Sequence, residues 1–260
     1  MNILVLVKSV PEVAEAELEI NDDGGLETED LVFGINEWDN FAVEEAIRVK
    51  EADGATVAVL TVGDDEAEDV LRRALAMGAD EAIHLNDEAF ADSDPATVAH
   101  LVAAAINDQS FDLILTGVQS ADANNAQTGV LLAQRLGLPY ATLATRIEMQ
   151  GDGLVVHREL ESDTEERVEL GLPAVVTVQS GINQPRYVSV MGIRKVRGKT
   201  VRELGREDLD VAETGTTASV VVRRTLTLPL AGGNAEMIEG SVAEVSDRLA
   251  TVIREKGGLS

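Results

Sequence analysis

The 260-residue chain has no cysteine. This absence excludes disulfide bonds, thiolate metal sites and thiol nucleophiles. The three histidines, His84, His100 and His157, lie far apart in the sequence without the spacing of metal ligands, so we expect no metal site. No apolar run is longer than a strand and no secretory signal is evident, which predicts a cytoplasmic protein with no direct membrane insertion.

Positive charge is also scarce. The chain has 21 Lys and Arg against 47 Asp and Glu, which gives a formal net charge of −26. Self-repulsion at this charge must be screened for the chain to stay compact, which predicts a salt-rich cytosol, as in a halophile. Nucleic acid is disfavoured as a partner, because binding to its phosphates needs a cationic surface.

Several catalytic and nucleotide-binding motifs are missing. No G-x-G-x-x-G follows the first apolar run, and the chain contains neither a P-loop nor a G-x-S-x-G nucleophile elbow. With 47 acidic residues, pairs of carboxylates are expected by chance. We therefore assign no catalytic residue and do not expect an enzyme.

The first half of the chain alternates between strand and helix patterns. Apolar runs typical of buried strands lie at 2–7, 56–62, 81–85 and 112–116. Helix patterns lie at 36–54, where Asn36 is a candidate N-cap, and at 64–78, 95–107 and 124–136. This alternation predicts an α/β fold with a Rossmann-like, doubly wound parallel sheet.

The pattern changes after about residue 140. Residues 153–159 and 166–171 predict a hairpin around an acidic turn, and 174–179 predict a further strand. We expect a turn at 21–25, an irregular arm from 181 that includes a loop at 211–217, and a final amphipathic helix at 240–255. That helix must dock on its own domain or on a partner chain.

The stretch GVQSADANNAQTG, residues 117–129, connects a predicted strand to a predicted helix. Its small and amide-bearing residues offer backbone N–H groups and short polar side chains. In open α/β sheets ligands bind beyond the carboxyl ends of the strands, and a helix N-terminus favours an anion. The loop is therefore a candidate nucleotide-phosphate site, with a capped surface loop as the alternative.

A cluster of basic residues interrupts the acidic sequence. It consists of Arg186, Arg194, Lys195, Arg197, Lys199, Arg202 and Arg206, and Glu203 is the one acid among them. In so acidic a chain we expect this cluster to contact an anionic partner surface or a cofactor.

Five stretches together resemble one protein family. They are NEWDNFAVEEAIRVKE (36–51), LRRALAMGADEAIHL (71–85), DLILTGVQSADANNAQTG (112–129), LPAVVTV (172–178) and NQPRYVSVMGIRKVRGK (183–199). In this order and spacing they resemble the beta subunit of electron transfer flavoproteins, from about residue 2 to 200.

The resemblance implies an adenine nucleotide alpha hydrolase-like fold and a heterodimer with an alpha subunit. It also implies FAD, shared with and held mostly by the alpha chain, and a structural AMP in this chain. The expected parts are a nucleotide-binding domain at 1–182, a partner recognition loop and basic segment at 183–200, and an arm with a docking helix at 201–260.

The resemblance assigns the AMP site by motif. The residues are Leu6, Lys8, Asn36, Glu37, Trp38, Asp39, Val62, Gly117, Gln119, Ser120, Asp122, Asn125, Ala126, Gln127 and Thr128. Trp38 either offers its ring to adenine or packs at the helix start. A lysine usual in the family is Val118 here, and Ala123, Asn124 and Asn125 stand in place of the family's acidic triplet. The sequence NAQTG lies between the AMP pattern and that of the electron-bifurcating, nitrogen-fixation-linked class, which binds a second FAD there.

The remaining implications concern partners. Arg186, Tyr187, Val190, Lys195 and Arg197 match the recognition segment, with Val190 as the apolar anchor, and Glu159 is expected near the flavin. Donors would resemble the acyl-CoA dehydrogenases of fatty acid oxidation, and the acceptor would be a membrane quinone oxidoreductase. Two alternatives stay open: a bifurcating subunit that adds NADH and a low-potential acceptor, and a stand-alone adenine-nucleotide-binding protein of the stress type.

Overall fold

The computed structural model describes residues 1–13, 18–21, 26–91, 93–161, 164–211, 218 and 237–256. The chain divides into two units, Met1–Arg224 and Thr225–Ser260, each of which is described by itself. The turn predicted at 21–25 and the loop predicted at 211–217 lie almost entirely outside the described residues.

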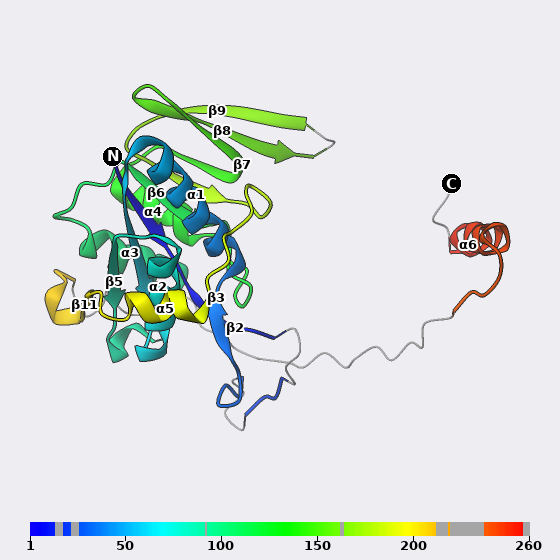
Figure 1. Cartoon of the computed structure of the whole chain (residues 1–260), viewed down its shortest axis with the longest axis horizontal. Coiled ribbons are helices and arrows are strands. Elements are labelled where there is room, and N and C mark those ends of the chain that lie inside the picture. The colour runs from blue at the N-terminus through cyan, green and yellow to red at the C-terminus, as the bar shows by residue number, and fades with distance from the viewer. Residues whose placement is uncertain are drawn as a thin grey trace. The chain divides into compact units, whose positions relative to one another are not determined.

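A nine-stranded sheet forms the centre of the first unit (Figure 1), in the order β11-β5-β4-β1-β6-β10-β7-β8-β9. The strands are β1 (Asn2–Leu6), β4 (Thr56–Val62), β5 (Glu81–Leu85), β6 (Leu113–Gly117), β7 (Tyr140–Gln150), β8 (Gly153–Leu160), β9 (Thr164–Gly171), β10 (Ala174–Val178) and β11 (Val201–Leu204). The apolar runs of β1, β4, β5, β6 and β10 are buried because helices cover both faces of this part of the sheet.

Alternate residues of the central strands enter two separate cores. Ile3 and Val5 of β1 belong to the core on the face covered by α1 (Glu37–Asp53) and α2 (Glu68–Met77). Leu4 and Leu6 belong to the core on the opposite face, covered by α3 (Pro95–Ala105) and α4 (Thr128–Leu136). This period of two follows from strand geometry, and the predicted Rossmann-like, doubly wound α/β fold is confirmed.

The sheet is mixed rather than wholly parallel. From β11 to β7 all neighbouring strands are parallel, whereas β8 runs antiparallel to both β7 and β9. The predicted hairpin is β8 and β9, but the sequence interpretation missed β7, the longest strand. Polar residues interrupt the apolar alternation in YATLATRIEMQ, and most residues of β7 are partly buried or exposed.

The prediction that an irregular arm begins at 181 is wrong for its first part. Residues 190–196 form the short helix α5 (Val190–Val196), and β11 pairs with β5 as the edge strand of the sheet. Leu204 and Leu209 are buried in the core beneath α3. The strand was missed because Arg202 and Glu203 interrupt its apolar pattern. The predicted domain boundaries at 182 and 200 remain predictions.

Helix α4 begins at Thr128, four residues later than predicted, so that 118–127 form a long loop. Asn124 and Ala126 have left-handed backbone conformations with φ of 50° and 51°, which no helix accommodates. Short elements complete this unit: β2 (Ser9–Pro11) paired with β3 (Phe33–Ile35), and the 3₁₀ turns η1 (Asp65–Ala67), η2 (Glu88–Phe90) and η3 (Arg206–Asp208).

The second unit contains the predicted helix α6 (Val242–Glu255). Ser241 and Glu244 form a reciprocal capping box at its start. Val242, Leu249 and Ile253 are exposed by 85%, 46% and 43%, so these apolar side chains of α6 are not buried within the described unit, and the predicted docking of this helix remains a prediction. Among all the described residues, no helix is both long enough and apolar enough to cross a membrane.

Candidate functional site

A cavity opens at the carboxyl ends of β1, β4 and β6. Strand connections run in opposite directions on the two sides of β1, so this is the topological switch point where ligands bind in such folds. Its empty space of about 870 Å³ includes open solvent at the mouth. Twelve of the fifteen residues predicted for the AMP site line it: Leu6, Lys8, Asn36, Asp39, Val62, Gly117, Gln119, Ser120, Asn125, Ala126, Gln127 and Thr128.

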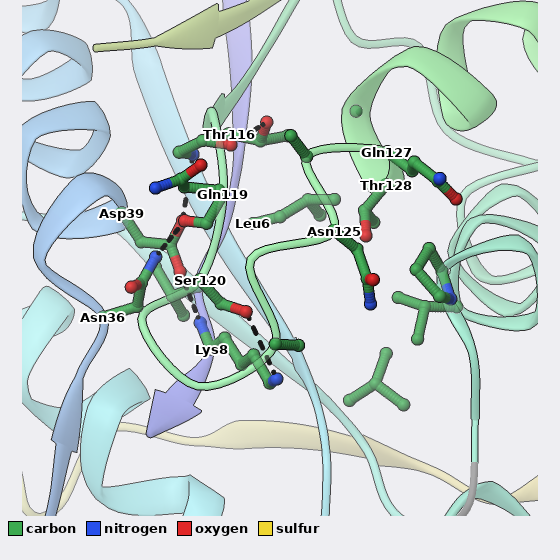
Figure 2. A pocket seen from close by; sticks show the side chains of 18 of the residues that line it. Leu6, Lys8, Asn36, Asp39, Thr116, Gln119, Ser120, Asn125, Gln127 and Thr128 are labelled. Atoms are coloured by element: carbon green, nitrogen blue, oxygen red, sulfur yellow. Dashed lines mark hydrogen bonds between the residues drawn. The ribbon is translucent and has the colours of Figure 1, made fainter. Parts of the chain in front are cut away.

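The cavity has walls of two kinds. One kind is apolar and comes from the strand ends and from one face of α3, with Leu6, Leu60, Val62, Pro95, Val98 and Val102. The other is polar and comes from Lys8, the 117–127 loop and the start of α4. Figure 2 shows Lys8 and Ser120 on one side of the opening and Asn125 and Thr128 on the other, with Leu6 between them. Such walls suit a ligand with a flat apolar part and an anionic part.

Asp39 joins the two strands that flank the switch point. Its side chain is buried, and it accepts hydrogen bonds from the backbone N–H groups of Lys8 and Gly117, both at 2.9 Å. Burial raises the pKa of Asp39 to about 7, although these hydrogen bonds and the Lys8 charge favour the ionised form. Asp39 therefore binds one proton more readily in the folded chain than in the unfolded chain.

Asn36 holds the loop rather than the helix. It occupies the N-cap position of α1, as predicted, but its side chain makes no capping hydrogen bond. Instead its amide donates to Gln119 O at 2.8 Å, and its carbonyl accepts from the N–H of Ala121 at 3.1 Å (Figure 2 shows the first of these). The predicted capping role is wrong, and Asn36 fixes the first half of the 117–127 loop to the body.

Lys8 is the cation at this site. Its ammonium lies 2.5 Å from the Asp122 carboxylate and 3.5 Å from the Ser120 hydroxyl. Burial opposes ionisation of Asp122, yet the bonds to Lys8 and Ser120 keep the pKa of Asp122 below its usual value. Asp122 is not part of the cavity wall. It orients Lys8, whose side chain is 45% exposed to solvent.

The second half of the loop leads into an uncapped helix. Gln127, at the N-cap position of α4, makes no side-chain capping bond. The first N–H groups of an α-helix have no partner within the helix, so they are available to a ligand at the cavity. A phosphate bound there would also interact with the Lys8 ammonium. The residues of the cavity therefore fit an adenine nucleotide.

Two predicted cofactor residues lie elsewhere. Trp38 does not line the cavity, because its indole N–H donates to the Gln179 side chain at 2.9 Å. Glu37 is exposed and also lies outside the wall. The sequence interpretation missed the wall from α3, namely Ser93, Pro95, Val98 and Val102. Pro95 at the first turn and the four-residue spacing of Val98 and Val102 predict the helix α3. They do not indicate that one face of this helix lines a cavity.

Arg186 serves the fold of this chain. Its guanidinium pairs with Glu44 at 2.8 Å and with Glu51 at 2.7 Å on α1, and Glu44 is buried. The bonds to Glu51 and Glu44 raise the pKa of Arg186 further above its already high value. Asn183 adds a hydrogen bond to Phe41 O at 3.0 Å. These contacts fasten the 183–188 segment to α1, so Arg186 is a structural cation in the described unit.

The predicted recognition residues around α5 are exposed. Tyr187 is exposed by 90%, Val190 by 65% and Met191 by 60%. Lys195 and Arg197 are also exposed, at the end of the same helix. Arg72 of α2 donates to Val196 O and to Lys199 O, at 3.3 and 2.5 Å, so α5 is fixed to the body by its C-terminal end. The predicted loop is therefore a short helix that presents apolar and cationic side chains to solvent.

Glu159 lies on the exposed part of the β8–β9 hairpin, opposite Glu165. Next to it, the buried His157 contacts Glu165 at 2.7 Å and Arg146 at 3.0 Å. The bond to His157 keeps the pKa of Glu165 below its usual value. Glu159 is therefore an exposed residue of β8, and its expected place near the flavin remains a prediction.

Comparisons with known proteins agree with this architecture. A family model described as the electron transfer flavoprotein domain matches residues 24–209. The chain is 36% identical over 265 residues to the electron transfer flavoprotein subunit beta of Methylophilus methylotrophus, covering 99% of this chain and 100% of that protein. It is 34% identical over 257 residues to the subunit of the same name from Bacillus subtilis (strain 168), covering 98% of both chains. It is also similar to the caffeyl-CoA reductase-Etf complex subunit CarD of Acetobacterium woodii, with 37% identity over 262 residues, covering 98% of this chain and 99% of that one.

Proposed function

The chain belongs to the family of electron transfer flavoprotein beta subunits, and we propose that it works in a heterodimer with an alpha subunit as an electron carrier. Flavin association is a property of this family. FAD, held mostly by the alpha chain, would supply the capacity to accept and release electrons. This chain would bind the alpha subunit, support one side of the flavin, and dock on the donor.

The cavity at the switch point carries our proposal of a structural nucleotide. Its apolar wall would hold the adenine ring, and Lys8 together with the uncapped start of α4 would hold the phosphate. AMP suits the charge of the site, because one ammonium and one helix N-terminus face the ligand. Asn36 and Asp39 would act indirectly, by holding the loop and the strand ends in place.

A second FAD in this cavity is the alternative. Ala123 and Ala126 contribute small side chains to the loop wall, and the cavity opens to solvent, so a ligand longer than AMP would find room there. The relative in Acetobacterium woodii is, by its name, a subunit of a caffeyl-CoA reductase-Etf complex. A bifurcating role with NADH as electron source would follow from this alternative. A stand-alone stress-type protein is disfavoured, since the relatives cover nearly the whole chain.

Electron donors would dock at α5. Val190 and Met191 offer an exposed apolar contact, and Lys195 and Arg197 add positive charge beside it. An acyl-CoA dehydrogenase-type donor with a complementary acidic rim would fit this surface, and a membrane quinone oxidoreductase would receive the electrons. We further propose that the protein works in the cytoplasm of a halophile, given the net charge of −26.

The test uses the alpha and beta chains produced together. We expect the two chains to copurify with flavin, and we expect an acyl-CoA dehydrogenase to reduce that flavin. Val190→Asp should slow this reduction at least about tenfold, because a buried unpaired charge at a contact costs more than 1.4 kcal/mol. Val32→Asp is the matched control, since Val32 is 66% exposed and Val190 65%. Equal rates for both variants would contradict docking at α5.

A further inference from the structure

The buried hydroxyl of Ser93 lies in the wall of the cavity, just before α3. Its oxygen is covered by the surrounding protein and has no hydrogen-bond partner among the residues that the structure describes. Ser93 itself lines the cavity together with Pro95, Val98 and Val102. A buried hydroxyl without a partner is unfavourable, and such groups in a folded chain call for an explanation.

Ser93 belongs to the wall that is otherwise apolar. Pro95, Val98 and Val102 are spaced on one face of α3, and Leu6 and Leu60 point toward the same side of the sheet. These side chains can cover the faces of a flat ring but cannot pair with its edge. Thr116 is bonded to Gly117 O at 2.8 Å and is already satisfied. Ser93 is therefore the hydroxyl that is available to the edge of a ring in this wall.

The opposite wall accounts for the anionic part of a ligand. Lys8 and the start of α4 lie there, on elements that follow β1 and β6. A nucleotide with its phosphate at Lys8 would place its base toward α3. Rotation about one side-chain bond moves a serine hydroxyl between staggered positions, so no backbone movement is needed for Ser93 to reach a base.

We propose that Ser93 is a specificity-determining residue, which recognises the edge of a purine base seated between α3 and the ends of β1 and β4. This inference rests on the proposed binding of an adenine nucleotide. The hydroxyl can both donate and accept one hydrogen bond, so it pairs with the ring nitrogens or the amino group of adenine. Its unpaired state in the absence of ligand is relieved when the base binds.

Thr61 provides a matched control. Its hydroxyl is also buried, with no hydrogen-bond partner in the described part of the chain, but Thr61 does not line the cavity. Ser93→Ala and Thr61→Val each remove one unpaired hydroxyl with little change in shape. Both variants should unfold at or slightly above the wild-type temperature, which checks that each variant is folded.

The experiment measures the binding of AMP and of inosine monophosphate to the full-length chain by calorimetry in high-salt buffer. In inosine monophosphate a carbonyl stands in place of the amino group of adenine, so a hydrogen-bond donor on the edge of the base becomes an acceptor. We expect Ser93→Ala to weaken AMP binding about fivefold, which matches the loss of one net hydrogen bond, and to reduce the preference for AMP over inosine monophosphate. Thr61→Val should leave both affinities unchanged.

Two results would overturn the inference in different ways. If the wild type binds AMP and Ser93→Ala binds it equally well with the same preference, Ser93 does not recognise the base, and the proposed nucleotide site stands. If the wild-type chain binds neither nucleotide, the proposed nucleotide site itself fails and takes this inference with it.

Discussion

The carboxylate of Asp39 accepts a hydrogen bond from the backbone N–H of Gly117 at 2.9 Å, across 78 residues of sequence. A side chain on Gly117 would lie 2.7 Å from the Cβ of Trp38 and closer still to the Asp39 carboxylate. Glycine at 117 and a short acid at 39 are therefore parts of one contact, which joins α1 to the strand that leads into the candidate nucleotide loop.

This contact makes stability depend on pH. The pKa of Asp39 is about 7 in the folded chain against 3.8 ordinarily, so the folded chain holds an extra proton between these values. The stability that comes from binding this proton is fully present below pH 3.8, the ordinary pKa. It is lost as the pH rises toward 7, the pKa in the folded chain. Between pH 5.5 and 7 we expect the free energy of unfolding of the wild-type chain to fall by about 2 kcal/mol because of Asp39. Asp39→Asn should abolish this fall.

Denaturant unfolding of both proteins at several pH values in high salt measures this slope. The control is Asp80→Asn, whose carboxyl accepts from the N–H of Val57 at 3.0 Å and whose pKa is lowered, despite partial burial, by Lys50 and Val57. It should leave the slope in this range unchanged. Parallel slopes for wild type and Asp39→Asn would contradict the role given to Asp39.

The two hydrogen bonds between Asn36 and the 119–121 segment predict that replacing Asn36 weakens nucleotide binding while changing the fold little. Asn36→Ala removes both hydrogen bonds to the 119–121 segment, so the loop must be ordered by the ligand itself. We expect the affinity for AMP to fall up to about 30-fold, the equivalent of two net hydrogen bonds of about 1 kcal/mol each. Asn183→Ala, which frees an amide bonded to Phe41 O and to Glu45, is the control outside the cavity. An equal loss of affinity in both variants would mean a general loss of structure.

The ion pairs of Arg186 predict a loss of stability rather than of partner binding. Arg186→Ala leaves the buried Glu44 carboxylate without its cation. We expect the free energy of unfolding to fall by about 2 kcal/mol, less than for a fully buried pair because Arg186 is partly exposed. Glu51→Gln, which changes the exposed partner, should have little effect. Denaturant unfolding of the variants measures these changes. If Arg186→Ala is as stable as the wild type, the ion pairs of Arg186 with α1 do not stabilise the fold.

The net charge of −26 predicts a dependence on salt. Lowering the ionic strength lengthens the range of the repulsion between like charges, so both the fold and the heterodimer should loosen in dilute buffer. Size-exclusion chromatography at decreasing salt should show a broadened or split peak. One sharp heterodimer peak in dilute buffer would contradict this prediction.

The sequence predicts the site well where the signals are local. The apolar run before Gly117 and the helix pattern after Thr128 located the loop at the switch point, since both are short-range patterns. The start of α4 was predicted too early because Asn124 and Ala126 adopt left-handed conformations that composition does not reveal. The α3 wall was missed because Val98 and Val102 have the same pattern whether they face a core or a ligand.

The long-range contacts could not be predicted from the sequence. Asn36 is a good N-cap by residue type, and only the fold shows that its amide binds a loop 83 residues away. The basic cluster at 186–206 was expected to face a partner, yet Arg186 pairs with α1 and Lys199 donates to Ala79 O at 2.9 Å. A count of charges does not say which of them the fold itself uses.

We propose above all that this chain holds one AMP in the cavity at the switch point, within a heterodimer that carries one FAD. The most direct measurement is the number of FAD and AMP molecules released per heterodimer after denaturation of protein purified in high salt. We expect one FAD and one AMP. Two FAD and no AMP would contradict it, and would make the second FAD the occupant of the cavity.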